Sequence, residues 1–140
     1  MTKVMASGVF DLIHPGHVSY LKQAKSYGDH LVVVVANDST VRKRKHEPIM
    51  PETMRAFMVE SLKPVDEVII GGSGDMFDTV SKIMPDIIVL GYDQTFDEKK
   101  LMDDLASRGL GSIRVVRVNE CVDDLNATRR IVAKIKEMES

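Results

Sequence analysis

Two histidines near the start of the chain are placed where they could bind phosphate. His14 and His17 lie three residues apart within the stretch GVFDLIHPGH of residues 8–17. Residues at positions i and i+3 share one face of a helix, so both imidazoles could donate hydrogen bonds to one phosphate chain. A helix N-terminus adds unpaired backbone N–H groups and a partial positive charge, which together suit an anion. These residue types at this spacing therefore predict a phosphate site.

A strand and a helix must flank this loop to hold the histidines. The apolar pattern predicts a strand over residues 3–7 and a helix over residues 16–27. Gly8 allows a sharp turn or the close approach of a ligand, and Gly16 leaves room for a phosphate beside the first helical turn. For either histidine alone, a helix cap or a surface residue is the usual alternative. Two histidines in this frame, with two glycines and a proline, favour the phosphate site.

Strands and helices alternate along the rest of the chain. Continuous β-branched runs such as LVVVVA suit a parallel sheet that is covered on both faces. The pattern predicts an α/β, Rossmann-like, doubly wound sheet of five parallel strands in the order 3-2-1-4-5. The carboxyl ends of the first and fourth strands would then be neighbours, and their loops would face one crevice. Strands are expected at residues 3–7, 30–36, 67–70, 87–90 and 113–118, and helices over residues 16–27, 51–62, 77–84, 97–108 and 125–137, with a short helical turn after residue 37.

Composition excludes several classes of protein. Lys and Arg number 19 and Asp and Glu number 21, so the net charge of −2 gives no general attraction to nucleic acid or to an anionic membrane. The lone cysteine, Cys121, excludes an internal disulfide framework. No apolar run reaches the roughly 18 residues of a membrane span, and no secretory signal fits before the first strand. We expect one cytoplasmic domain over residues 1–140, with no nucleic-acid or membrane partner.

One basic run follows the second expected strand. Residues 41–46 read VRKRKH and leave the carboxyl end of that strand, the edge at which open α/β sheets bind ligands. Lysines at this edge could close over a triphosphate. The alternative is an ordinary solvated surface loop.

The other loop that faces the crevice could wrap a nucleoside. Residues 91–95 read GYDQT, in which an aromatic ring could pack on the nucleoside and a carboxylate or the backbone could bind ribose hydroxyls. An ordinary strand-to-helix loop is the alternative. In the last expected helix, Asn126 suits the N-cap. Arg129 and Arg130 lie in its first turn, where cations oppose the helix dipole, and this placement indicates an anionic ligand.

The pattern GxFDxxHxGH resembles the signature of a nucleotidyltransferase superfamily. That superfamily includes glycerol-3-phosphate and choline-phosphate cytidylyltransferases, pantetheine-phosphate adenylyltransferase and archaeal FAD synthase. The resemblance implies that His14 and His17 are catalytic and that Lys43 and Lys45 of the basic run contact the phosphates. It implies nucleotide contacts at Gly8, Val9, Phe10, Asp11, His14, Gly16, His17, Gly91, Tyr92, Asp93, Asn126, Thr128 and Arg129, and acceptor contacts at Asp11, Asp38 and Arg55.

Two parts of the resemblance leave alternatives open. Glu52 and Arg55 match an ExxR spacing in which the arginine supports the phosphate site, and the alternative is an i,i+3 ion pair at the surface. The second family signature, ISST or ISTT at a helix start, is matched only in part. Thr128 falls on its final threonine and Asn126 on its first serine, whereas Ala127 lacks a hydroxyl group.

Later segments of the chain resemble archaeal FAD synthase most. They include LKPVD at residues 62–66 and PDIIVLGYDQTFDE at residues 85–98. This resemblance implies transfer of AMP from ATP to FMN, with release of diphosphate. The alternatives are a glycerol-3-phosphate cytidylyltransferase, which would use CTP, and a non-catalytic nucleotide-binding module. Phe10, Tyr92 and Phe96 are the aromatic candidates for a flavin pocket.

The expected reaction is an in-line attack by the acceptor on the α-phosphate of the triphosphate. No nucleophilic side chain stands beside a base, so a covalent intermediate is not expected. Positioning and charge stabilisation would supply most of the catalysis, and Asp11 would orient the loop or the acceptor. Mg²⁺ or another divalent cation would be bound through the triphosphate, because no carboxylate cluster could build a metal site from side chains. The family resemblance also implies a homodimer.

Overall fold

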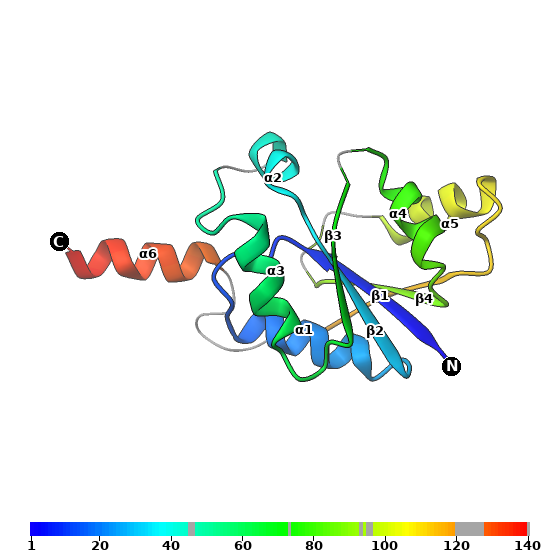
Figure 1. Cartoon of the computed structure of the whole chain (residues 1–140), viewed down its shortest axis with the longest axis horizontal. Coiled ribbons are helices and arrows are strands. Elements are labelled where there is room, and N and C mark those ends of the chain that lie inside the picture. Colours follow the sequence, from blue (N-terminus) through cyan, green and yellow to red (C-terminus); the bar gives the residue numbers. More distant parts are fainter. Residues whose placement is uncertain (45–46, 73, 93, 95–96, 120–127, 140) are drawn as a thin grey trace.

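The computed structural model of the chain contains one sheet of five parallel strands (Figure 1). The strand order is β3-β2-β1-β4-β5, which confirms the predicted doubly wound α/β topology. The structure describes residues 1–44, 47–72, 74–92, 94, 97–119 and 128–139. The strands are β1 (Lys3–Gly8), β2 (His30–Val35), β3 (Glu67–Ile70), β4 (Ile87–Leu90) and β5 (Arg114–Arg117), and the helices are α1 (Pro15–Lys25), α2 (Asp38–Arg44), α3 (Glu52–Glu60), α4 (Met76–Ile83), α5 (Glu98–Ser107) and α6 (Thr128–Glu139).

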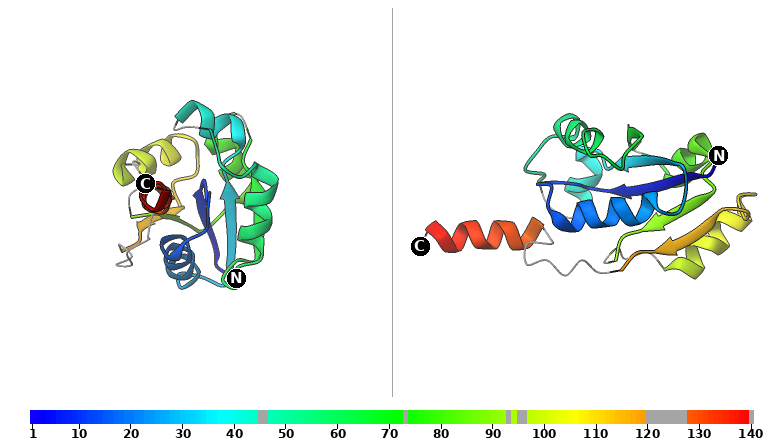
Figure 2. Two further views of the ribbon diagram at one scale, coloured as in Figure 1. Left: turned by 90° about the vertical axis from the view of Figure 1, so that its left-hand side faces the viewer. Right: turned by 90° about the horizontal axis from the view of Figure 1, so that it is seen from below.

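Neighbouring side chains of the central strands enter two separate cores. On β1, Val4 packs in the core that includes α1 and α3, whereas Met5 packs in the core that includes α4 and α5. Side chains alternate across a strand, so a strand that is apolar at every position must be buried on both faces. β2 meets this condition, because its residues from Leu31 to Val35 are all buried. Helices accordingly cover both faces of the sheet (Figure 2).

The observed boundaries differ from the predicted ones by a few residues. β1 continues to Gly8 because this residue still pairs with Val35 of β2. α1 is shorter than expected and ends at Lys25, and β5 covers only part of the expected strand. The expected helical turn after the second strand is a helix of seven residues, α2, which carries the first part of the basic run. Its start is capped by Asn37, whose Oδ1 accepts a hydrogen bond from the Thr40 N–H at 2.8 Å.

The last helix stands apart from the sheet. α6 extends away from the body of the domain (Figure 1 and the right-hand view of Figure 2). Its side chains at Ile135 and Met138 are 50% and 76% exposed. Among the described helices, none is both long enough and apolar enough to cross a bilayer.

Candidate active site

The crevice of the sheet opens where β1 and β4 part. These two strands pair only as far as Ala6 and Val89, whereas β1 stays paired with β2 to its end. Beyond that point the Tyr20 hydroxyl accepts a hydrogen bond from the Ser7 N–H at 3.1 Å, and Gln94 Nε2 donates to the Ser7 carbonyl at 2.8 Å. Side chains therefore replace strand pairing at the topological switch point, which is where open α/β sheets bind ligands.

Both histidines cap the N-terminus of α1 through one ring nitrogen each. His14 Nδ1 accepts from the Gly16 N–H at 3.0 Å, and His17 Nδ1 accepts from the His14 N–H at 3.3 Å. A ring nitrogen that accepts a hydrogen bond carries no proton, so the proton of the neutral ring lies on Nε2. The two rings stack with centroids 3.7 Å apart. The caps therefore fix two neighbouring Nε2–H donors at the start of one helix.

The cap and the phosphate site are compatible roles for these histidines. The helix cap, which is the usual alternative role of a histidine at this position, is present. It uses Nδ1, whereas hydrogen bonds to a phosphate would come from Nε2. The predicted common direction of the two rings is confirmed by their stacking.

The loop between β1 and α1 has an unusual backbone conformation. Phe10 and Leu12 have φ angles of 56° and 49°, in the left-handed region that residues other than glycine rarely adopt. The Phe10 ring is 2% exposed and packs between Tyr20 and His17, with ring centroids 6.3 and 5.2 Å away. A Cβ on Gly8 would lie 3.0 Å from this ring, so the glycine makes room for Phe10. The expected flavin contact by the Phe10 ring is wrong, because the ring is buried in the core.

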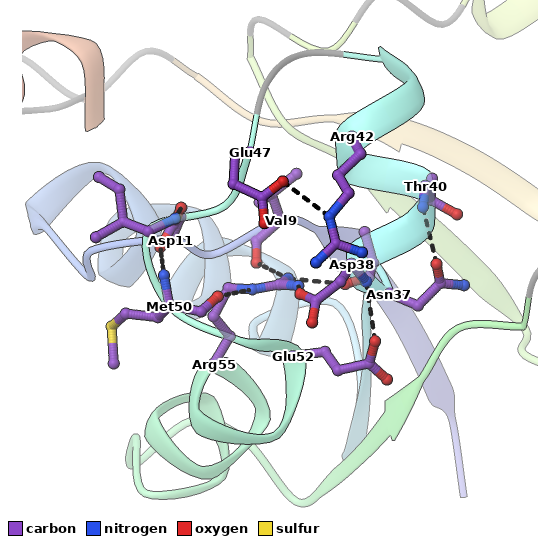
Figure 3. A network of polar contacts seen from close by, with 12 residues as sticks. Val9, Asp11, Asn37, Asp38, Thr40, Arg42, Glu47, Met50, Glu52 and Arg55 are labelled. Carbon is purple, nitrogen blue, oxygen red and sulfur yellow. Dashed lines mark hydrogen bonds and ion pairs between the residues drawn. The ribbon is translucent and has the colours of Figure 1, made fainter.

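Arg55 joins three loops at the carboxyl edge of the sheet (Figure 3). Its side chain is completely buried, and Nε donates to the Met50 carbonyl at 2.9 Å. Nη1 donates to the carbonyls of Val9 and Ala36 at 2.8 and 2.7 Å, and Nη2 donates to Asp38 Oδ1 at 2.6 Å. A guanidinium group holds its acceptors in fixed directions. Arg55 therefore fixes the loops that follow β1 and β2 against the loop that precedes α3.

Two predictions for Arg55, the surface ion pair and the acceptor contact, need correction. The surface ion pair with Glu52 is wrong: Arg55 pairs with Asp38, and Glu52 Oε1 accepts from the Asp38 N–H at 2.9 Å. Direct contact with an acceptor does not fit a side chain that has no exposed surface. Arg55 is therefore a positioning residue. Burial raises the pKa of the Asp38 carboxyl, but the hydrogen bond from Arg55 and the nearby positive charges outweigh burial, so the net pKa lies below its usual value.

Asp11 holds the loop that precedes α3. Its Oδ2 and Oδ1 atoms accept hydrogen bonds from the Ile49 and Met50 N–H groups at 2.7 and 3.0 Å, and the residue is 4% exposed. Orienting a loop was one of the two roles expected for this carboxylate. The nucleotide and acceptor contacts of Asp11 stay predictions.

The basic helix α2 begins at the same edge of the sheet. Asn37 Nδ2 donates to the Gly71 carbonyl at 2.9 Å and so ties the start of α2 to the end of β3. Arg42 is exposed and forms an ion pair with Glu47 at 2.8 Å. Lys43, the predicted phosphate ligand, is exposed on the next position of the helix.

Arg117 holds the loop between β4 and α5 from the neighbouring strand. Its Nη1 donates to the carbonyls of Gly91 and Gln94, each at 2.8 Å, and its Nε pairs with Glu98. Gln94 Oε1 also accepts from the Gly91 N–H at 2.8 Å, so the loop is closed on itself. Gly91 is buried, whereas Tyr92 is 53% exposed. In the loop expected to contact a nucleoside, the backbone is therefore held at Gly91 and Gln94, and the Tyr92 side chain is exposed.

The two arginines of β5, Arg114 and Arg117, lie on opposite faces of the strand. Arg114 is exposed, but Arg117 turns toward the loop after β4 and is partly buried. Positions i and i+3 of a strand point to opposite faces, and this separates the two side chains.

Several predicted site residues lie outside the part of the chain that the structure describes. They are Lys45, Asp93, Phe96 and Asn126. Thr128 and Arg129 open α6, but their side chains also lie outside the described residues. Within the described part, no group of three or more His, Cys, Asp or Glu side chains could hold a metal ion.

Sequence reasoning missed three residues that shape the crevice. Tyr20 lies one turn after His17 and fits the pattern of an ordinary core residue. Gln94 was noticed only as part of a loop motif. Arg117 gave a usable signal, because a cation at the carboxyl end of a strand stands at the edge where ligands bind.

Comparison with known proteins gives consistent matches. Residues 5–133 match the family described as Cytidylyltransferase-like. The chain is similar to a protein named FAD synthase from Aciduliprofundum boonei, at 57% identity over 96% of this chain and 91% of that protein. It is 50% identical to a protein of the same name from Thermoplasma acidophilum, over 99% of this chain and 96% of the other. A crystal structure described as the lipopolysaccharide core biosynthesis protein from Thermoplasma volcanium GSS1 matches with a TM-score of 0.84 and 48% identity, over 86% of this chain and 98% of that one.

Proposed function

The chain belongs to the cytidylyltransferase-like family, and on that premise we propose that it transfers AMP from ATP to FMN, forming FAD and diphosphate. Relatives named FAD synthase, matched along nearly the whole chain, support these two substrates. We assign the activity to one domain, residues 1–140. Within the structure, the pair of Nε2–H donors at the start of α1 carries the proposal.

The transfer proceeds by in-line displacement. A phosphate oxygen of FMN attacks the α-phosphorus of ATP, the bond to the bridging oxygen breaks, and diphosphate leaves with that electron pair. Negative charge increases on the α-phosphate and on the bridging oxygen, and the Nε2–H groups of His14 and His17 stabilise it. The N-terminus of α1 adds its partial positive charge.

The basic helix α2 serves the leaving diphosphate. Its charge is neutralised by Lys43 of α2 and by Lys45, which follows α2 in the sequence. The divalent cation, which we propose is Mg²⁺, enters bound to ATP and neutralises phosphate charge.

The nucleoside and the acceptor occupy the two ends of the crevice. Tyr92 presents its exposed side chain from the loop after β4. The remaining proposed nucleotide contacts are Gly8, Val9, Phe10 through its backbone, Asp11, Gly16, Gly91, Asp93, Asn126, Thr128 and Arg129, and the proposed acceptor contacts are Asp11 and Asp38. We further propose a homodimer, which is supported by exposed apolar side chains on α3, at Met54, Phe57 and Met58.

The test is diphosphate release by the purified protein with Mg²⁺, in which ATP or CTP is combined with FMN or glycerol 3-phosphate. We expect release only with ATP and FMN, together with FAD. His17→Ala should lower kcat about 10²-fold or more, because one donor to the developing charge is lost. His30→Ala is the matched control, because His30 opens β2 at the opposite edge of the sheet and contacts Glu67.

Three results would change the assignment. Diphosphate release only with CTP and glycerol 3-phosphate would show that these, and not ATP and FMN, are the substrates. Binding of ATP without diphosphate release in any combination would favour a nucleotide-binding module. An unchanged kcat in His17→Ala would remove this histidine from the reaction.

A further inference from the structure

The hydroxyl group of Tyr20 bridges β1 and β4 where the two strands part. It donates to the Val89 carbonyl at 2.5 Å and accepts from the Ser7 N–H at 3.1 Å, while the Ser7 carbonyl lies 3.3 Å away. Tyr20 is 8% exposed, and burial raises the pKa of its phenol above the usual range. The hydroxyl therefore stays protonated and keeps its proton available for the hydrogen bond to β4.

The ring of Tyr20 is connected to the histidines by a series of aromatic contacts. Phe10 stacks on Tyr20 with the ring planes 8° apart and the centroids 6.3 Å apart. Phe10 also contacts His17 at 5.2 Å, and His17 stacks on His14 at 3.7 Å. These four side chains form a ring column that runs from the bridging hydroxyl to the Nε2–H donors.

The ring column has one end on each side of the crevice. Its histidine end lies at the start of α1, on the phosphate side. Its tyrosine end is bonded to Val89, two residues before Gly91, where the loop toward the nucleoside begins. Close packing makes such a series resist compression and tilting. A shift of the Tyr20 hydroxyl would therefore move the histidines relative to that loop.

We propose that Tyr20 is a positioning residue for AMP transfer, which sets the place of His14 and His17 relative to β4. This inference rests on the proposed function, because it assumes that the two sides of the crevice hold the phosphates and the nucleoside of one ATP. The transferred α-phosphate lies between those sides. Tyr20 acts through His17 and touches neither substrate.

Tyr20→Phe tests the inference, because it keeps the ring and removes only the hydroxyl. Two backbone groups, of Ser7 and Val89, then lose their side-chain partner. We expect kcat to fall about tenfold, since small misplacements of reacting groups cost rates of this order, while KM for FMN stays within about twofold. Tyr27→Phe is the matched control, because Tyr27 is 40% exposed just beyond the end of α1; its kcat should match that of the unmodified protein.

A spectroscopic measurement separates positioning from simple loss of stability. The ¹⁵N NMR signals of the imidazoles report the ring tautomer and the surroundings of each nitrogen. In Tyr20→Phe we expect the signals of His14 and His17 to shift and the signal of His30 to stay, whereas Tyr27→Phe leaves all three in place. A merely structural role would lower the unfolding temperature without moving the two histidine signals in the folded protein.

A second variant keeps the test decisive if Tyr20→Phe does not fold. Phe10→Leu removes one ring from the ring column and leaves the hydroxyl bridge intact, and the same histidine signals should shift. Unmoved signals and an unchanged kcat in the folded variant would overturn the inference. If the unmodified protein forms no FAD but binds ATP, and the histidine signals still shift, then the proposed function fails while the coupling through the ring column stands.

Discussion

Two arginines hold the two sides of the crevice, and they do so at different depths. Arg55 has no exposed surface, and it joins the loops after β1 and β2 to the loop before α3. Arg117 is 25% exposed, and it donates to two carbonyls of the loop after β4, with the 42% exposed Glu98 as its ion-pair partner. Both guanidinium groups donate hydrogen bonds to backbone carbonyls, Arg55 in the interior and Arg117 near the surface.

This difference in burial indicates that the two sides of the crevice tolerate substitution of their arginine to different extents. Removing a buried charged group leaves its partners unpaired in the interior, which is strongly destabilising. A partly exposed pair is replaced more easily, because water can reach the groups that it leaves. The side that we propose binds the phosphates is therefore held by a contact in the interior of the protein. The side that we propose binds the nucleoside is held at Gly91 and Gln94 by a contact that water can reach.

The largest effect is expected for Arg55→Met. Three carbonyls and the Asp38 carboxylate lose their donor, so the free energy of unfolding should fall by about 3–5 kcal/mol. Urea denaturation measures this loss. Arg42→Gln, at an exposed ion pair of the same region, is the control and should leave the unfolding free energy almost unchanged. Equal losses in the two variants would show that burial does not distinguish the arginines.

Arg117→Lys should affect ligand binding more than stability. An ammonium group cannot reproduce the bonds to two carbonyls and Glu98, so we expect a loss of about 1–2 kcal/mol in unfolding free energy. KM for ATP should rise roughly tenfold, equal to about 1.4 kcal/mol of binding free energy, with kcat little changed. Steady-state kinetics and urea denaturation measure both effects, with Arg114→Lys on the exposed face of β5 as the control. A loss as large as that of Arg55→Met would contradict the comparison.

Acid sensitivity is the smallest of the three expected effects. The pKa of Asp38 is lower in the folded protein than in the unfolded chain, because the bonds and charges around it outweigh its burial. Its stabilising contribution is therefore complete above about pH 4, the unfolded pKa of an aspartate, and it disappears as the pH falls through the folded value. Asp38→Asn should be less stable than the unmodified protein at pH 6, and its unfolding free energy should depend less on pH below about 4. Urea titrations at several pH values measure the slope, and Asp103→Asn is an exposed control. Identical slopes in Asp38→Asn and the unmodified protein would show that Asp38 does not contribute to the pH dependence of the unfolding free energy.

The fold was predictable because its signals are local. Apolar runs separated by helix-length amphipathic segments, as in residues 30–36 and 87–90, require parallel strands covered on both faces. The right-handed crossover and the position of the first strand then leave few strand orders. The loop that carries the two histidines was predictable for the same reason, since these histidines and the helix that holds them are adjacent in sequence.

The contacts that complete the site were not predictable, because they join residues distant in sequence. The sequence offers two interpretations of Arg55, a surface ion pair with Glu52 and support of the phosphate site, and neither predicts bonds to three loop carbonyls. Phe10 was chosen as a flavin contact for its aromatic ring, but the positive φ at this position directs the chain so that the ring enters the core. Each error concerns the direction of a long side chain, which depends on what other segments offer it.

The reach of these side chains also fixes when the site can appear during folding. Arg55 bonds to Val9 across 46 positions, Tyr20 to Val89 across 69 and Gln94 to Ser7 across 87. Such distant contacts form only after long loops have closed, later than the helices that carry them. The ability to hold ATP should therefore arise as one of the last events of refolding. Because a ligand of the folded state stabilises that state alone, nucleotide would select fully assembled chains over partly folded ones.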